Sequence, residues 1–236
     1  GGRAGDAFTD ADYNVALGYN ALTSDTLGST STAIGYSALE TQNFTTATNS
    51  YNTAVGYTAG TAVTTAEENT FIGGLAGTST TTGALNTAVG SNALADNTEG
   101  ASNVAIGREA LHANTTASNN VAVGKHALRA NTTGTSNVAV GKDSGLNVTT
   151  GVENTLIGAL TGDALTEGGL NVAVGTSALG VDTKGSRNVA VGVSALNQQN
   201  FTTATTSYNT GVGYQAGGAI TTGVENTLIG GLSGDA

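Results

Sequence analysis

A five-residue motif recurs along this chain at a nearly constant interval, and this repetition limits the possible folds more than any other feature. The motif reads Asn, then Val or Thr, a mostly Ala position, an aliphatic residue and Gly. It occurs thirteen times, with a spacing of 17 residues except for two steps of 21. Such a period indicates an array in which each repeat packs on the next, and we number the residues of a repeat from its Asn as position 1.

The length of the repeat favours strands over helices. Two packed helices need upwards of about 30 residues, and a Gly in mid-repeat destabilises a helix by about 1 kcal/mol relative to Ala. A 17-residue repeat fits one coil, with a strand at positions 1 to 4, a Gly corner at position 5, a second short strand near positions 6 to 10 and a Thr-x-Gly return turn. We therefore predict an all-β fold, a parallel β-solenoid of about 13 coils, two of them with 21 residues, in a single domain over residues 1–236.

Equivalent residues of successive coils should form ladders along the axis of a solenoid. We expect structural ladders of Asn at position 1, Gly at position 5 and Thr at position 13, and we expect positions 2 and 4 to face the same side of the strand. In the middle of the chain the ladders consist of Asn103, Asn120 and Asn137, of Gly107, Gly124 and Gly141, and of Thr115, Thr132 and Thr149.

Position 9 alternates in blocks between Leu and Gly. Where two consecutive repeats have Gly at position 9, position 3 of the second repeat carries a large residue, namely Phe71, Leu156 or Leu228. We interpret this pattern as an exchange of volume, in which a large residue on the strand replaces a lost Leu in the interior.

Two sets of aromatic residues are candidate contact surfaces. Position 6 is Tyr19, Tyr36 and Tyr57 in three successive repeats, a stripe that either binds a partner or simply covers the edge of the coils. Both 21-residue repeats contain a segment of nearly identical sequence, around Phe44 in one and Phe201 in the other. Their four additional residues should bulge outward from the coil. Each Phe is either an exposed contact or a local lid.

A short basic column follows the Tyr stripe at position 6. It consists of Arg108, Lys125 and Lys142 in three successive repeats. Cations at this spacing would repel one another unless they are solvated or paired, and we expect the neighbouring Glu109 and Asp143 to moderate the repulsion.

The composition argues against several functional classes. With 5% aromatic residues, 10% charged residues and 36 Gly, any interior must be thin and built from small side chains. A net charge of −10 with seven scattered Lys and Arg argues against nucleic acid as a partner, and no apolar run is long enough for a membrane span. His112 and His126 occupy different repeat positions with no matching ligand set, so we expect no metal, no cofactor and no enzyme activity.

The motifs at 103–107, 120–124 and 188–192, which read Asn-Val-Ala-Ile-Gly or Asn-Val-Ala-Val-Gly, resemble the Ser-Val-Ala-Ile-Gly repeats of trimeric autotransporter adhesin heads. Similar repeats are found in phage tail-fibre shafts. The resemblance implies a left-handed parallel β-roll with three chains side by side, located extracellularly, on a cell surface or on a virion, and binding a host or matrix surface. Ala at position 3 would suit the close approach of a neighbouring chain.

These observations predict a non-enzymatic structural fibre or adhesin shaft that assembles with itself, as a homotrimer in the favoured case. The first and the last seven residues both match positions 5 to 11 of a repeat, which we expect either of a segment of a longer array or of copies that stack end to end. The second possibility makes a homopolymeric surface filament an alternative function. A third hypothesis is an ice-binding solenoid, since a Thr ladder at coil spacing can order water.

Overall fold

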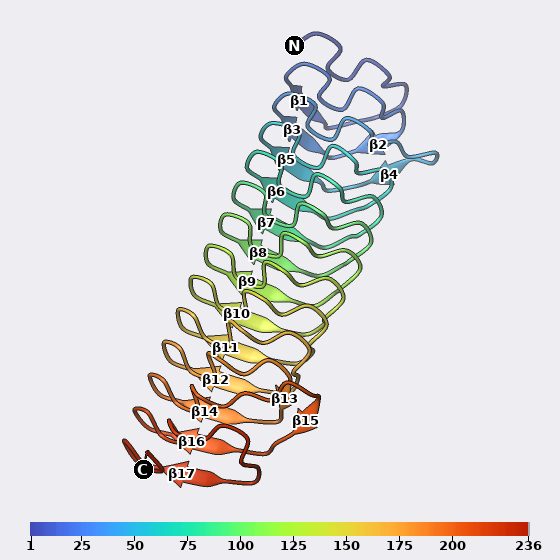
Figure 1. Ribbon diagram of the computed structural model, residues 1–236. Coiled ribbons are helices and arrows are strands. Elements are labelled where there is room, and N and C mark those ends of the chain that lie inside the picture. The colour runs from blue at the N-terminus through green and yellow to red at the C-terminus, as the bar shows by residue number, and fades with distance from the viewer. Residues whose placement is uncertain (236) are drawn as a thin grey trace. The chain divides into compact units, whose positions relative to one another are not determined.

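The computed structural model describes residues 1–235, which form strands and turns and contain no helix, so none that could cross a membrane. The chain divides into two compact units, residues 1–118 and 119–236, each of which is a parallel β-solenoid. Together the units hold thirteen three-residue strands, one in each repeat (Figure 1). The predicted all-β solenoid of about 13 coils is therefore confirmed.

In the first unit, six strands at positions 2 to 4 form one sheet, and every pair of neighbours is parallel. Their order is β1 (Val15–Leu17), β3 (Thr32–Ile34), β5 (Thr53–Val55), β6 (Thr70–Ile72), β7 (Thr87–Val89) and β8 (Val104–Ile106). A separate two-stranded pair, β2 (Gly28–Ser29) and β4 (Thr48–Asn49), joins the first long repeat, residues 31–51, to the repeat before it.

The second unit repeats this arrangement with seven strands. Their order is β9 (Val121–Val123), β10 (Val138–Val140), β11 (Thr155–Ile157), β12 (Val172–Val174), β14 (Val189–Val191), β16 (Thr210–Val212) and β17 (Thr227–Ile229). The pair β13 (Gly185–Ser186) and β15 (Thr205–Thr206) joins the second long repeat, residues 188–208, to the repeat before it. Within both units the register places each residue opposite its equivalent one repeat away, as for Ala122 and Ala139.

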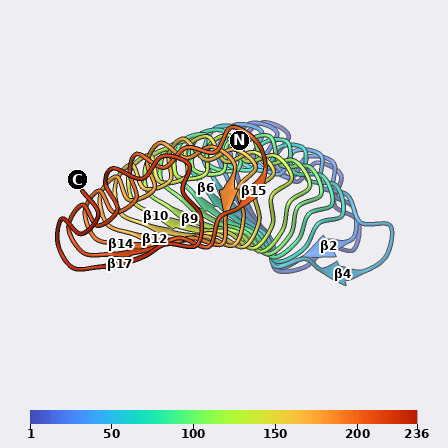
Figure 2. The same cartoon turned by 60° about the horizontal axis from the view of Figure 1, so that its bottom comes forward.

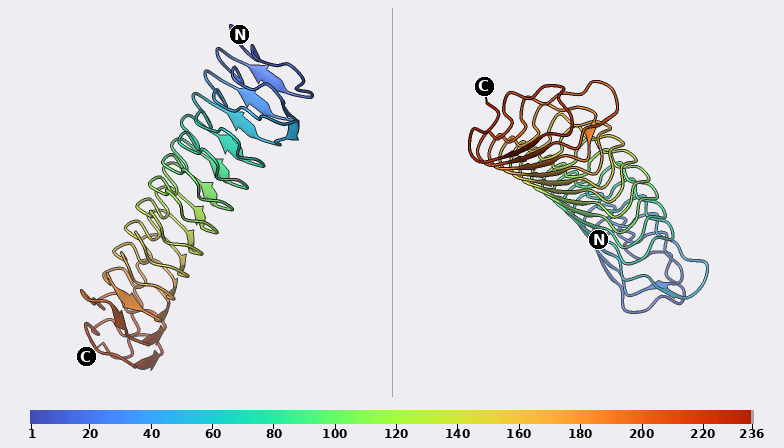
Figure 3. Two further views of the ribbon diagram at one scale, coloured as in Figure 1. Left: turned by 90° about the vertical axis from the view of Figure 1, so that its right-hand side faces the viewer. Right: turned by 90° about the horizontal axis from the view of Figure 1, so that it is seen from below.

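The predicted second strand near positions 6 to 10 is wrong. In each unit the three-residue strands lie along one side of the coils, and apart from the two short strand pairs the rest of each coil is a series of turns (Figures 2 and 3). The reason is local: positions 7 and 9 adopt left-handed backbone angles even where they are not Gly, with φ of 58° at Asn20 and 49° at Leu22. Two such residues on alternate positions interrupt an extended chain.

The interior of each coil is built from position 3 of the strand and positions 8 and 9 of the turns. Ala33 and Ala139 at position 3 and Leu39 and Leu128 at position 9 are completely buried. Positions 2 and 4 share the outer side, as predicted, and are partly exposed. The expectation that Ala at position 3 meets a neighbouring chain is wrong, because this Ala faces the interior of its own coil.

The predicted exchange of volume between positions 3 and 9 is confirmed. Phe71 is fully buried and occupies the space that position 9 leaves empty in two coils. A β-carbon on Gly60 would lie 2.8 Å from its ring, and one on Gly77 would also collide with it. Leu156 fills the same space beside Gly145, where a β-carbon would lie 2.8 Å from the Leu side chain.

Candidate contact surfaces

The Asn ladder at position 1 lies inside the coils and is fully engaged in hydrogen bonds. In the first unit, the backbone N–H of Asn103 donates to Oδ1 of Asn86 at 3.0 Å, and its Nδ2 donates to the carbonyl of Ala117 at 2.9 Å. In the second unit, the N–H of Asn137 donates to Oδ1 of Asn120 at 2.9 Å. From Asn52 to Asn209 the asparagines at position 1 are buried. They therefore tie each coil to the next and present no group to a ligand.

The Gly and Thr ladders are also internal scaffolding. Gly107, Gly124 and Gly141 hold φ between 131° and 136° at the corner that follows the strand. The hydroxyl of Thr132 donates to the carbonyl of Thr149 at 3.2 Å, and Thr115 is likewise half-buried. Because the hydroxyls donate to the protein itself, this ladder offers few free donors to order water.

A second buried amide ladder, at position 12, was missed by the sequence analysis. Nδ2 of Asn114 donates to Oδ1 of Asn97 at 2.8 Å and to the carbonyl of Ala117 at 3.0 Å. In the second unit, Nδ2 of Asn131 donates to the carbonyl of Gly134 at 3.0 Å. The signal in the sequence is an Asn directly before the conserved Thr in three successive repeats.

The outer face of the strands is a regular surface of aliphatic and Thr side chains in each unit. In the first unit, Leu17, Ile72 and Ile106 at position 4 have exposed fractions of 60%, 40% and 40%. In the second unit, Val140 and Ile157 are 36% and 40% exposed. None of the thirteen motifs contains a charged residue, so this face is uncharged in both units, with Val or Thr at position 2 and an aliphatic residue at position 4.

The Tyr stripe is an exposed stack of three rings in the first unit. The ring centroids of Tyr19 and Tyr36 are 5.6 Å apart, and those of Tyr36 and Tyr57 are 5.4 Å apart, with 16° between the planes in each pair. The exposed fractions are 48%, 48% and 59% in chain order. The position 6 turn places each ring on the surface, one coil after another.

The interpretation of Phe44 and Phe201 as exposed contacts is wrong, and the alternative of a local lid is correct. Their exposed fractions are only 4% and 6%. The bulge itself is present as predicted: the residues that follow each Phe, 45–47 and 202–204, are exposed. Each long coil therefore presents a Thr-Thr-Ala tip whose base is anchored by a buried aromatic ring.

A buried carboxylate in the preceding coil holds each of these loops. Oδ1 of Asp182 accepts hydrogen bonds from the backbone N–H groups of Gly185 and Phe201, both at 3.0 Å. Its Oδ2 accepts a hydrogen bond from Nε2 of Gln199 at 2.6 Å. Asp25 makes the same three bonds in the first unit, to Gly28, Gln42 and Phe44. Both carboxylates are completely buried and have all their bonds from within the protein, so they hold the loop rather than a ligand.

Glu109 and Asp143 pair with their neighbouring cations at position 6, as expected. Arg108 contacts Glu109 at 2.6 Å in the first unit, and Lys142 contacts Asp143 at 3.3 Å in the second. Asp143 also lies 2.9 Å from Nδ1 of His126. Burial alone would raise the pKa of Asp143, but the hydrogen bonds from His126 and Lys142 outweigh it and hold the pKa below its ordinary value.

This lowered pKa makes a pH-dependent contribution to stability. The carboxylate of Asp143 stabilises the fold at pH values above its ordinary pKa of 3.8, and the contribution is lost as the pH falls through the lower value of the folded state. We expect Asp143→Asn to lower the free energy of unfolding at pH 7 and to make little difference in acid. Urea unfolding at several pH values measures this; a deficit that stays constant down to the lowest pH would contradict it.

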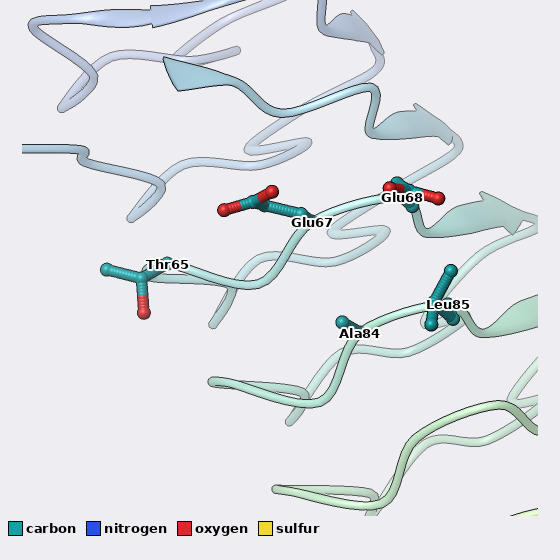
Figure 4. Close-up of a pocket in the computed structure, with 5 residues that line it drawn as sticks. All are labelled: Thr65, Glu67, Glu68, Ala84 and Leu85. Atoms are coloured by element: carbon teal, nitrogen blue, oxygen red, sulfur yellow. The ribbon is translucent and has the colours of Figure 1, made fainter. Parts of the chain in front are cut away.

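A shallow depression in the first unit lies between two return turns and is lined by Thr65, Glu67, Glu68, Ala84 and Leu85 (Figure 4). Figure 4 shows the two carboxylates at separate places along the turn, pointing away from each other. Over residues 1–235 no group of acidic, His or Cys side chains could hold a metal ion.

No family model matches this chain, and neither a curated protein nor a solved structure matches it. The relation to adhesin head and tail-fibre repeats therefore stays a prediction from the motifs. The functional argument depends on the fold and on the surfaces described above.

Proposed function

We propose that this chain is a non-enzymatic structural fibre or adhesin shaft that assembles with itself through the outer face of its strands. The observation that carries the proposal is the uncovered, uncharged face of each unit, with its exposed aliphatic residues at position 4. Parallel sheets are normally covered on both faces, because their strands are apolar on both sides. Here the coil covers one face and solvent meets the other, where Ile106 and Ile157 are each 40% exposed.

A second copy of the same chain is the partner that fits this face best. The ladders of Val, Ile and Thr repeat once per coil. An identical face therefore presents side chains with the same spacing along the axis of the solenoid. The face carries no charge although the chain has a net charge of −10, so contact there places no charged side chains directly against each other. Homo-oligomers are usually closed by rotational symmetry.

We propose a homotrimer, the arrangement that the motif resemblance implies. Three copies around an axis would cover the outer face of every sheet with the faces of the other two. The thin, Ala-rich interior of each coil gives limited apolar burial by itself, so the second buried face adds substantially to stability at about 25 cal/mol per Å². The proposed location is extracellular, on a cell surface or on a virion, with attachment through the Thr-Thr-Ala tips and the Tyr stripe.

The test places charges on the proposed interface. We expect the wild-type chain to sediment with the mass of three chains, and the double variant Val140→Lys with Ile157→Lys to sediment as a single chain, because two ammonium groups per copy cannot be buried there without partners. Sedimentation velocity over a dilution series measures the mass, and circular dichroism checks that the variant keeps its strands.

The matched control puts the same charges on the return turns. Thr133 and Thr150 are exposed in the same unit, and their replacement by Lys is expected to leave the trimer intact. A wild-type chain that sediments as a monomer at every concentration would overturn the proposal, and so would dissociation by both double variants alike. A series of ever-larger species would favour the end-to-end filament instead.

A further inference from the structure

The stack of Tyr rings ends abruptly at a glycine. Position 6 carries Tyr19, Tyr36 and Tyr57 in three successive coils, and the next coil has Gly74 in their place. The two steps within the stack are 5.6 and 5.4 Å, with nearly parallel rings. The next step of the column contains no side chain.

The two ends of the stack differ. At the first end, the ring of Tyr19 lies against the backbone of Gly2, where a β-carbon would be 3.5 Å from the ring. At the other end, a β-carbon on Gly74 would meet no atom within 4 Å. Tyr57 is also the most exposed of the three rings, at 59% against 48% for each of the others. One face of the Tyr57 ring is therefore open to solvent, and the space beside it, over Gly74, contains no side chain.

We propose that the space between Tyr57 and the coil of Ser91, with Gly74 as its floor, binds a planar aromatic ligand as a fourth ring of the stack. Aromatic rings attract one another in offset stacks with centroids about 4.5 to 7 Å apart, and the steps already present fall in that range. A ring in the empty step continues the column at the same spacing. On the far side, the side chains of Ser91 and Asn92, which hydrogen-bond to each other at 3.2 Å, offer polar partners.

The ligand is expected to carry a positive charge. The chain has a net charge of −10, which attracts cations from solution, and the face of a Tyr ring attracts a cation directly. The ring of Tyr57 is held in place by Tyr36 behind it, so little side-chain freedom is lost on binding. Tyr214 occupies position 6 in the second unit, is 57% exposed and has no ring stacked on it, so it lacks this support.

The experiment titrates the protein with thioflavin T, a planar cationic dye, and follows its fluorescence and anisotropy. Tyr57→Ala removes the platform and Gly74→Tyr fills the space with a fourth protein ring, so each change is expected to weaken binding by about tenfold or more. Gly74 has no left-handed φ, and its position is open, so the Tyr fits. Tyr214→Ala is the matched control and is expected to leave the affinity unchanged.

Three results of the dye titration would overturn the proposal. They are no binding by the wild-type chain, equal affinity in the wild-type chain and both Tyr57→Ala and Gly74→Tyr, and an equal loss with Tyr214→Ala. A neutral glucose hexamer serves as the competitor. If it binds more tightly than the dye and depends on Tyr57, the site takes a sugar ring and the assignment to planar aromatic compounds is wrong.

Discussion

Replacing Gly73 by Ala is expected to lower the free energy of unfolding by about 3 kcal/mol, whereas the same change at the adjacent Gly74 should leave it unchanged or raise it by about 0.5 kcal/mol. Gly73 is the corner that follows strand β6, and its φ is 132°. A side chain there forces the backbone into a region that L-residues rarely adopt. Its β-carbon would also lie 2.6 Å from the carbonyl oxygen of Gly90 in the next coil.

The obstacle at Gly73 is backbone that is itself fixed by the next corner, so the clash cannot be relieved by a side-chain rotation. Gly74 has neither problem, since its φ is not left-handed and a β-carbon there would be in open space. Ala in that position reduces the freedom of the unfolded chain. Urea unfolding followed by circular dichroism compares the two variants, and Gly74→Ala is the control for the loss of a glycine. Equal stabilities would contradict the role assigned to the corner.

Phe71→Ala is expected to destabilise the protein by about 3 to 5 kcal/mol, the range found when a buried ring is deleted and leaves a cavity. Phe71 is completely buried, and the residues that would otherwise fill its space, Gly60 and Gly77, have no side chains. The surrounding coils are held by ladders of hydrogen bonds on both sides and cannot collapse into the gap. Equilibrium unfolding in urea gives the loss directly.

The same site offers a rescue that distinguishes volume exchange from a special requirement for Phe. In ordinary coils position 3 is Ala and position 9 is Leu. The φ angles of Leu39 and Leu94, 49° and 54°, are close to those of Gly60 and Gly77, 58° and 57°, so Leu fits the backbone at both glycines. The triple variant Phe71→Ala, Gly60→Leu, Gly77→Leu should therefore recover most of the stability. Gly77→Leu alone should destabilise, because its side chain collides with the ring. Additive losses would show that the three positions do not share one space.

Much of the fold follows from the repeat because periodic side chains make periodic contacts. The constant interval predicts parallel strands in register, and register turns each conserved position into a ladder, as at Asn103 and Asn120. The exchange between Phe71 and its glycines was also predictable, because the total volume of a regular coil has to stay constant.

The failures have physical reasons. Alternation shows that positions 2 and 4 share a side, but it does not tell which side is the interior, and the short coil turns the smaller residue inward, as with Ala139. The left-handed angles at position 9 are carried by Leu, as at Leu22 and Leu39, a residue type that rarely adopts them, so the turns that replace the second strand leave no clear signature.

The burial of Phe44 and Phe201 depends on residues from the preceding repeat, which inspection of the loop alone misses. Asp occurs at position 12 only at Asp25 and Asp182, and each stands 19 residues before its Phe. With this spacing in view, the Asp predicts that the following loop folds back, because a buried carboxylate needs donors and the loop supplies them.

The dependence of each long loop on an Asp in the coil before it has an evolutionary consequence. An insertion copied without that Asp would lose the acceptor for the N–H of its Phe and for its Gln amide. The smallest portable module is therefore a pair of adjacent repeats, the receiving coil together with the looped one. The two copies, 157 residues apart, each retain both halves. A designer who wished to graft a peptide onto another solenoid at this position would have to transplant the receiving coil as well.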